Sequence, residues 1–167
     1  MADISKSPEG TPPTTGSATV SQSAPPAARD ALHKFLLINR YLRRYARQVT
    51  AYGLPPKQYS VLRFLLEQGQ ATVGAVQDYL YSSASMASTV ITQLEQAGYV
   101  TRERSQEDNR VVMVTLTAAG QVLAQQTPMG GLVLLRRRLE TLPQERLAVI
   151  DAALTDIMEL MEVTDEE

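Results

Sequence analysis

The spacing of apolar residues changes at Gly98, and this change constrains the fold more than any other feature of the chain. Before Gly98, apolar side chains recur three or four residues apart, which predicts amphipathic helices. After it, apolar and polar residues alternate from Val100, and the run from Val111 to Leu116 is rich in β-branched residues. Turn-forming residues lie between these two segments. The chain is therefore predicted to place a β-hairpin directly after a run of helices.

Three helices are predicted in the first part of this run. The first is long and amphipathic and stops at Gly53. The second begins near Pro55, where proline suits a first helical turn, and it ends at Gly69. Thr72 then provides an N-cap for a short helix over residues 73–80.

A fourth helix, from about Ser83 to Gln96, is predicted to have one buried face and one polar face. The buried stripe comprises Ala87, Val90, Ile91 and Leu94. The other side presents hydroxyl, amide or small groups: Ser83, Ser85, Met86, Ser88, Thr89, Thr92 and Gln93. Such groups can bind base edges or phosphates, so these residues are candidate DNA contacts. The alternative is an ordinary polar surface.

Two more helices are predicted after the hairpin. Thr117 is a suitable N-cap for the first, and Pro143 opens the second. Pro128 and the pair Gly130–Gly131 interrupt the first of these helices, which predicts a kink or a break. The bend is either plain chain geometry or part of a small-molecule pocket.

Composition narrows the function classes. The chain has 167 residues, no cysteine and one histidine, so we expect neither a metal site nor a cofactor. No apolar run approaches the roughly 18 residues of a membrane span, so we expect a cytoplasmic protein. The net charge is −2, but basic and acidic residues are unevenly distributed along the chain. From Arg29 to Arg110 there are 11 basic and 7 acidic residues, whereas the residues after Arg110 include 4 basic and 9 acidic ones.

Four ordered segments carry a family resemblance: Gln58–Leu62, Leu94–Arg102, Glu107–Arg110 and Val114–Gly120. The last three contain the patterns LE-x-x-GYV-x-R, D-x-R and LT-x-x-G. Each pattern alone is weak, but their combination in this order is specific. Over residues 30–162 the chain resembles the MarR family of winged helix-turn-helix transcriptional regulators.

The resemblance implies a mainly α fold with a small β-hairpin wing, built as a winged helix-turn-helix lobe plus a helical dimerisation region. It also implies a homodimer that binds a pseudo-palindromic site in double-stranded DNA. The expected parts are a flexible N-terminal arm (1–26), a dimerisation helix (27–52), the DNA-binding lobe (54–116), C-terminal dimerisation helices (117–162) and an acidic tail (163–167).

The wing supplies further expectations from the resemblance. Arg102, Arg104 and Arg110 would be its basic groups, with Arg110 entering the minor groove and Asp108 orienting the arginines. The alternative is that Asp108 and Arg110 only hold the hairpin turn. The chain departs from the family in three respects: its recognition helix carries no positive charge, Asn109 stands where an arginine is common, and the segment from Pro128 to Gly131 interrupts what is usually one long helix.

Many relatives release DNA when a phenolic or other small aromatic acid binds near the dimer junction. Rings and cations that could line such a site here are Arg40, Tyr41, Arg44, Tyr45 and Tyr59. Tyrosines at helical spacing are also typical of a core.

The most specific hypothesis is a sequence-specific DNA-binding regulator, a repressor relieved by a small aromatic or phenolic effector. An enzyme is not expected, because the sequence shows no nucleophile with a base, no acid/base carboxylate pair and no phosphate-binding glycine loop. The remaining alternative is a winged helix that serves as a protein-interaction module without ligand sensing.

Overall fold

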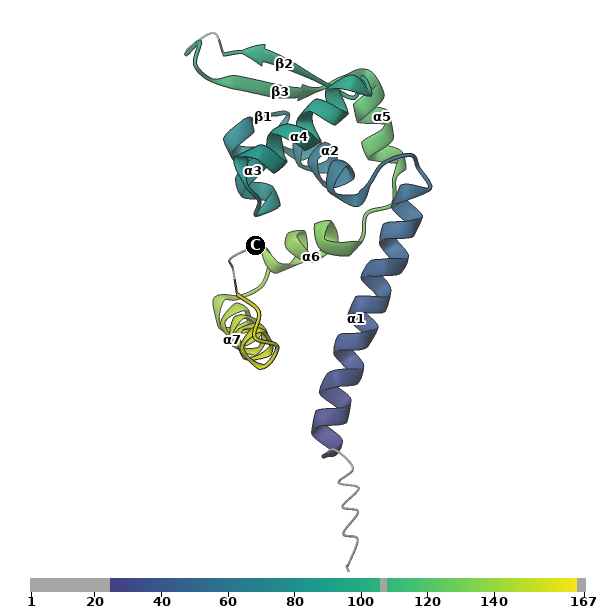
Figure 1. The fold of residues 1–167 in the computed structure, drawn as a ribbon, viewed down its shortest axis with the longest axis vertical. Coiled ribbons are helices and arrows are strands. Elements are labelled where there is room, and N and C mark those ends of the chain that lie inside the picture. Colours follow the sequence, from purple (N-terminus) through teal and green to yellow (C-terminus); the bar gives the residue numbers. More distant parts are fainter. Residues whose placement is uncertain (1–24, 106–107, 165–167) are drawn as a thin grey trace, which may run out of the picture. The chain divides into compact units, whose positions relative to one another are not determined.

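The computed structural model describes residues 25–105 and 108–164, in two compact units that divide between Phe35 and Leu36. The first unit contributes the first turns of helix α1 (Pro26–Thr50), and the second contains the rest of α1 and every later element (Figure 1). The arm predicted for residues 1–26 lies almost wholly outside the described residues, as does the end of the predicted acidic tail. Within the described ranges, no helix is long and apolar enough to cross a membrane.

Four helices and a small antiparallel sheet build the part of the second unit that we call the winged lobe, residues 54–126. The first three helices are α2 (Pro56–Gln68), α3 (Val73–Leu80) and α4 (Ala84–Gln96), and the fourth is α5 (Ala118–Gln126). The strands are β1 (Gln70–Thr72), β2 (Val100–Arg104) and β3 (Val112–Leu116). Strand β3 is central in the sheet order β1-β3-β2, and β2 with β3 forms the predicted hairpin (Figure 1). The mainly α fold with a β-hairpin wing is confirmed.

Helix starts in the lobe follow the predicted caps. The Thr72 hydroxyl accepts a hydrogen bond from the Ala75 N–H at 3.0 Å, and the Ser83 hydroxyl accepts one from the Met86 N–H at 3.2 Å. Each bond satisfies a backbone donor that the first helical turn leaves without a partner. The predicted starts of α3 and α4 are therefore confirmed.

The third strand, β1, was not predicted. It has three residues, too few for an alternating pattern, and it pairs with β3, so that Ala71 lies opposite Val114. The pairing joins residues more than forty positions apart in the chain, which a local pattern cannot reveal.

The lobe has a contiguous apolar core of its own. Its buried members include the predicted stripe of α4, which is confirmed; the fully buried side chains are Val61, Leu62, Leu65, Val76, Ala87, Ile91, Leu94, Val114 and Ala124. Helix α5 (Ala118–Gln126) closes this core from the C-terminal side, because Ala124 belongs to the cluster. The core fixes the direction in which α4 and the hairpin present their outer faces.

The LT-x-x-G pattern has a structural explanation at Gly120. A Cβ on this residue would overlap the backbone carbonyl oxygen of Tyr99. That carbonyl also accepts a hydrogen bond from the Thr117 N–H at 3.0 Å, and the Thr117 hydroxyl caps α5 through the Gly120 N–H at 3.1 Å. Glycine is therefore needed for the close approach of α5 to the start of β2.

The predicted interruption after the hairpin is a complete break. Helix α5 ends at Gln126, and α6 (Gly131–Leu139) begins only after the segment 127–130. The last predicted helix is present as α7 (Gln144–Leu160). The long helix expected from the resemblance is thus two short helices with a connection between them.

The terminal helices expose most of their apolar residues. Within the described residues α7 has no buried side chain, and only Tyr45 and Val49 are buried in α1. Apolar side chains more than half exposed include Leu32, Leu36, Ile38, Val149, Leu154 and Met161. These stripes are amphipathic, as predicted, but the described chain itself covers little of them.

Candidate nucleic-acid interface

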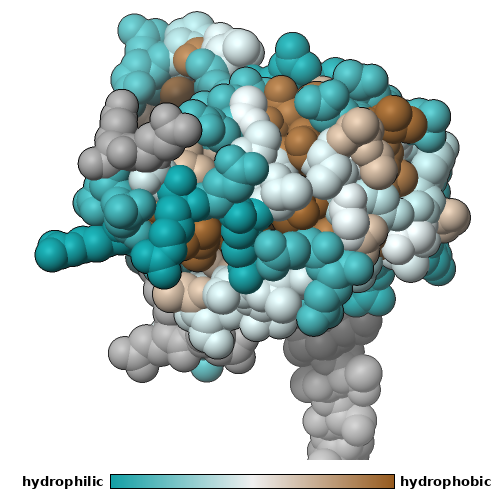
Figure 2. Space-filling model, turned by 90° about the horizontal axis from the view of Figure 1, so that it is seen from above, coloured by the Kyte–Doolittle hydropathy of each residue, from teal (hydrophilic) through white to brown (hydrophobic). Residues whose placement is uncertain are grey.

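The outer face of α4 is polar and accessible. Ser85, Met86, Ser88, Thr89 and Gln93 are exposed, Thr92 is half-buried, and Ser83 is exposed at the N-cap. They point outward because the stripe from Ala87 to Leu94 is held in the core on the opposite side. Figure 2 looks onto the molecule from above and shows hydrophilic side chains over much of the visible face, with apolar patches between them.

The turn between α3 and α4 brings the two helices together. Tyr81 ends α3 with a left-handed backbone, φ 47°, and its N–H bonds back to the Asp78 carbonyl at 3.2 Å. Two residues later Ser83 caps α4. This tight connection makes α3 and α4 a helix-turn-helix, and α4 is its second helix.

Arg102 fastens the hairpin to α4. Its guanidinium donates hydrogen bonds to the Thr92 hydroxyl at 2.8 Å and to the Ser88 carbonyl at 3.2 Å. It also forms an ion pair with Glu95 at 3.4 Å. The sequence assigned Arg102 and Thr92 to DNA contact, but in the structure each is engaged by the other. Arg102 therefore fixes the position of β2 against α4.

Gln93 is also engaged within the protein. The Gln58 side-chain amide of α2 donates a hydrogen bond to the Gln93 side-chain oxygen at 2.8 Å. Both residues are exposed, so this contact orients the Gln93 amide at the surface without removing it from solvent. The bond leaves the Gln93 NH2 group pointing away from Gln58 as a donor.

At the hairpin turn, Asp108 supports the backbone. Its carboxylate accepts a hydrogen bond from the Arg110 N–H at 2.9 Å, and its carbonyl accepts one from the Val111 N–H at 2.9 Å. The Arg104 guanidinium donates to the Asn109 carbonyl at 3.0 Å. These are the turn-holding contacts that the sequence left open as an alternative for Asp108. Arg110 itself is exposed, and residues 106–107 of the turn lie outside the described residues.

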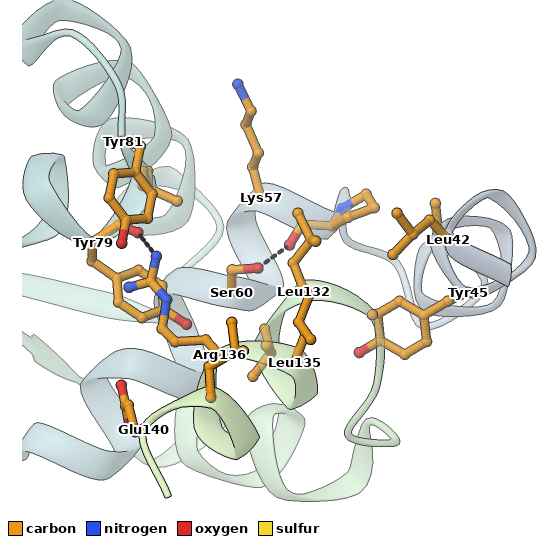
Figure 3. A pocket seen from close by; sticks show the side chains of 16 residues that line it. Leu42, Tyr45, Lys57, Ser60, Tyr79, Tyr81, Leu132, Leu135, Arg136 and Glu140 are labelled. Carbon is orange, nitrogen blue, oxygen red and sulfur yellow. Dashed lines mark hydrogen bonds between the residues drawn. The ribbon is translucent and has the colours of Figure 1, made fainter. Parts of the chain in front are cut away.

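A cavity of about 750 Å³ lies on another side of the lobe, among α1, α2, the C-terminal end of α3 and α6. Its lining is mainly aliphatic, and includes Leu42, Leu80, Leu132, Val133, Leu135 and Leu139. Figure 3 shows Arg136 of α6 reaching toward Tyr79 and Tyr81 at one side of this cavity, with Leu42 and Tyr45 on the opposite side.

Of the five residues predicted to line a ligand pocket, Tyr45 alone lines this cavity. Arg40 and Arg44 are exposed on α1. The hydroxyls of the three tyrosines bond to the break between α5 and α6: Tyr59 to the Thr127 carbonyl at 2.8 Å, Tyr45 to the Pro128 carbonyl at 2.9 Å, and Tyr41 to the Gly131 N–H at 3.1 Å. This cavity thus shares only Tyr45 with the expected lining, and the hydroxyls of the three tyrosines bond to the helix break.

Burial sets the protonation of two of these tyrosines. Loss of solvent raises the pKa of the Tyr45 hydroxyl well above its ordinary value, and it also raises the pKa of the Tyr59 hydroxyl. Both remain neutral donors through the neutral pH range. The hydrogen bonds that Tyr45 and Tyr59 donate to the break are therefore insensitive to pH near neutrality.

Sequence reasoning missed Arg136 and Tyr79. The Arg136 guanidinium lies 3.8 Å from the centroid of the Tyr79 ring and also donates a hydrogen bond to the Tyr79 carbonyl. The only local signal is the run Arg136–Arg138, and basic residues at the end of a helix are common because they favour its dipole. Their contact with α3 depends on the path of the chain after the break.

A comparison with protein families identifies the lobe. Residues 54–112 match the model of the MarR family. Among curated proteins, the chain is similar to YsmB of Bacillus subtilis, an uncharacterised HTH-type transcriptional regulator, with 26% identity over 66% of this chain and 75% of that protein. It is also similar to the organic hydroperoxide resistance transcriptional regulator of the same organism, with 36% identity over 40% of this chain and 45% of that protein. The second alignment spans less than half of the curated relative.

Solved structures share the fold over most of the chain. AbsC, a MarR family transcriptional regulator from Streptomyces coelicolor, matches with a TM-score of 0.59 and 24% identity, over 86% of this chain and 100% of that one. Streptococcus pneumoniae FabT, in complex with DNA, matches with 0.56 and 21%, over 81% and 97%. NadR, in complex with 4-hydroxyphenylacetate, matches with 0.52 and 20%, over 83% and 96%.

These findings agree with the helix-turn-helix and wing described above. Members of the matched family are transcriptional regulators and not enzymes, which confirms the expectation from the sequence. The match covers α2 to the start of β3, which contributes most of the buried core of the lobe. Residues 54–112 of the chain are therefore similar to the MarR family, and the fold of the chain is that of winged helix-turn-helix structures such as AbsC.

Proposed function

We propose that this regulator binds a specific site in duplex DNA and represses transcription there. In the proposal, α4 enters the major groove and the wing, β2 and β3 with their turn, reaches the adjacent minor groove. The observation that carries it is the accessible polar face of α4, which a buried stripe on the opposite side holds outward. The DNA-bound structure of FabT, which shares the fold, supports this arrangement.

In this proposal, α4 and the wing have different roles in DNA binding. Ser85, Ser88, Thr89 and Gln93 offer hydroxyl and amide groups that can hydrogen-bond base edges, but no charge. Arg110 is the exposed cation of the turn, so it provides the attraction to the DNA backbone and the narrow minor groove. Arg102 acts indirectly, because its bonds to α4 hold the wing in place.

We further propose that the protein binds DNA as a homodimer. The support is the apolar surface that α1 and α7 leave exposed, which needs a partner to be removed from water. A two-fold dimer presents two copies of α4 to half-sites about one helical turn apart. The operator in this proposal is accordingly a pseudo-palindrome.

Finally, we propose that a small ligand relieves this repression. The cavity of about 750 Å³ supports it, because the volume is typical of ligand pockets and the lining joins α6 to the end of α3. The 4-hydroxyphenylacetate complex of NadR shows that a protein of this fold binds a phenolic acid. The expected effector is an aromatic or phenolic acid.

The test is binding of the full chain to the promoter region beside its own gene, measured by fluorescence anisotropy at several salt concentrations. Arg110→Ala should weaken binding to all sequences and reduce the slope of log K against log[salt] by about 1. Gln93→Ala should cost about 1–3 kcal/mol on the specific site and relax base preference.

Arg146→Ala is the matched control, since Arg146 is an exposed arginine on α7, outside the lobe. It should bind as the wild type does. Normal binding by Arg110→Ala would overturn the role of the wing. Wild-type binding that ignored both sequence and salt would overturn the proposed operator recognition and favour a protein-interaction role for the lobe.

A further inference from the structure

Gln58 and Gln93 join the surfaces of α2 and α4, two helices that lie side by side in the lobe (Figure 1). The Gln58 Nε2 donates a hydrogen bond to the Gln93 Oε1 at 2.8 Å. Each residue is next to a side chain of the core in the sequence: Tyr59 is 1% exposed, and Leu94 is fully buried. Packing therefore holds both backbones in place, and the bond joins two side chains whose Cα atoms are fixed.

We infer that Gln58 determines which base the protein reads, because it sets the direction of the Gln93 amide. This inference rests on the proposed recognition of DNA by α4, and it names a positioning residue for that recognition. Gln58 belongs to α2, outside the helix-turn-helix that α3 and α4 form. In the inference Gln93 is a hydrogen-bond donor to DNA, and the base that it reads is guanine and not adenine.

The direction of the Gln93 amide follows from the bond. A free glutamine side chain has a donor end, the NH2 group, and an acceptor end, the carbonyl oxygen, and it pairs with adenine through both of them. Here the Gln58 N–H holds the Gln93 oxygen, so the oxygen is turned toward α2. Turning this oxygen to a base would break the bond. The NH2 group is therefore the end of the Gln93 amide that remains for DNA.

The identity of the base follows from this donor. In the major groove guanine presents two acceptors, N7 and O6, whereas thymine presents one acceptor beside a methyl group. An NH2 group can bond the N7 of adenine, but the amino donor of adenine then has no acceptor, and cytosine presents only an amino donor. Guanine is therefore the base that best matches the Gln93 donor.

Thr89, one helical turn before Gln93, is fixed with the opposite polarity. Its hydroxyl donates a hydrogen bond to the Ser85 carbonyl at 2.9 Å, so the hydroxyl keeps only acceptor positions for DNA. This bond lies within α4 and does not involve α2. A change at Gln58 should therefore alter the reading of the base pair that Gln93 contacts and leave the reading by Thr89 as it is.

The test begins with the selection of binding sites by the full chain from a random duplex library. The base pair at which Gln93→Ala loses the preference of the wild type is the pair that Gln93 reads. There the wild type should bind guanine about 10-fold more tightly than adenine. Fluorescence anisotropy on duplexes that differ at this pair alone measures the ratio of the two affinities.

Three substitutions of Gln58 separate the polarity of the bond from its presence. Gln58→Leu removes the donor, so the preference for guanine over adenine should fall about 5-fold. The carboxylate of Gln58→Glu only accepts, so it should engage the Gln93 NH2 group, turn the oxygen to DNA and make adenine or cytosine the preferred base. The ammonium of Gln58→Lys still donates, so this variant should keep the preference for guanine.

Lys57→Gln is the matched control for charge. It lowers the net charge by the same amount as Gln58→Glu, at an adjacent and exposed position of α2. It should change the affinity for all sequences alike and leave the base preference unchanged. In every Gln58 variant the preference at the other pairs of the site should stay as in the wild type. Melting curves check that each variant folds.

Three results would overturn the inference and leave the proposed operator recognition standing. These are a wild type that prefers adenine at the Gln93 pair, an unchanged preference there in both Gln58→Leu and Gln58→Glu, and a Gln93→Ala variant that relaxes no pair of the selected site. A change of equal size at every pair in the Gln58 variants would also overturn the inference, because it would show a general effect on the lobe. Selection of no sequence by the wild type would overturn both proposals.

Discussion

The winged lobe buries its apolar side chains in a core of its own, whereas the terminal helices leave most of theirs exposed. The lobe encloses a contiguous core to which α2, α3, α4, the sheet and α5 all contribute. Helix α7 buries no side chain in the described chain, and α1 buries only Tyr45 and Val49. The lobe can therefore hold its fold alone, whereas the terminal helices are stable only against another surface. Folding and assembly are expected to be separable by mutation.

The largest expected effect tests this contrast directly. Ile91 is fully buried in the lobe, so Ile91→Ala should lower the free energy of unfolding by about 2–5 kcal/mol at any protein concentration. Leu154 is 53% exposed on α7, so the loss caused by Leu154→Ala should depend on protein concentration. Urea denaturation at two concentrations measures both. Equal, concentration-independent losses would remove the distinction between the two regions.

The connection between the winged lobe and the terminal helices should be sensitive to substitution of Gly131. This residue has φ +57°, and a Cβ on it would lie 2.5 Å from an atom of the Tyr45 ring. Gly131→Ala should therefore destabilise the protein by about 1–3 kcal/mol, measured by urea denaturation. Gly74→Ala in α3 is the matched control, because its nearest neighbour to an added Cβ lies at 3.7 Å and its φ is ordinary. No loss in either variant would mean that the break is loosely held.

Removing one hydroxyl from the same connection should destabilise the protein by a similar amount. Tyr59 is 1% exposed and its hydroxyl donates to the Thr127 carbonyl, so Tyr59→Phe should cost about 1–3 kcal/mol by leaving a buried acceptor without its donor. Tyr52→Phe, at a tyrosine 43% exposed, should stay within about 0.5 kcal/mol of the wild type. Thermal melts would compare them. Equal melting temperatures for all three proteins would contradict the assigned bond.

The smallest expected effect is a change in the free energy of unfolding with pH. Burial raises the pKa of Tyr45 and Tyr59 above the unfolded value near 10. Below that value the tyrosines are neutral in both states and their contribution is complete. Above it the unfolded chain ionises first, so the free energy of unfolding should fall as the pH rises from about 10. Urea midpoints at pH 8 and pH 10.5 measure the fall, and it should be smaller in Tyr45→Phe. A flat profile would argue against burial of these hydroxyls.

Much of the lobe could be predicted because its signals are local. Thr72, Ser83 and Thr117 each cap the helix that the sequence assigned to them. The buried stripe of α4 follows from helical spacing, and the break after α5 from Pro128 with its neighbouring glycines. Each of these features depends on residues close together in the chain.

What could not be predicted depends on distant pairs. Strand β1 exists only because β3 pairs with it, and Arg136 reaches Tyr79 only because of the course of α6 after the break. A side chain can also have two plausible partners. Arg102 looks like a DNA-binding cation in the sequence, yet Thr92 and Glu95 of α4 already engage it. Charge alone does not tell which partner a guanidinium has.

The break between α5 and α6 has a genetic consequence. A continuous helix would transmit any movement of α6 to the lobe as a rigid unit, whereas here residues 127–131 are held to α1 and α2 by three tyrosine hydroxyls. Selection for variants that repress but no longer respond to an inducer should therefore yield substitutions at Tyr41, Tyr45 or Tyr59. In the proposed scheme none of these three tyrosines contacts the operator, so their alleles would lie outside the operator contacts.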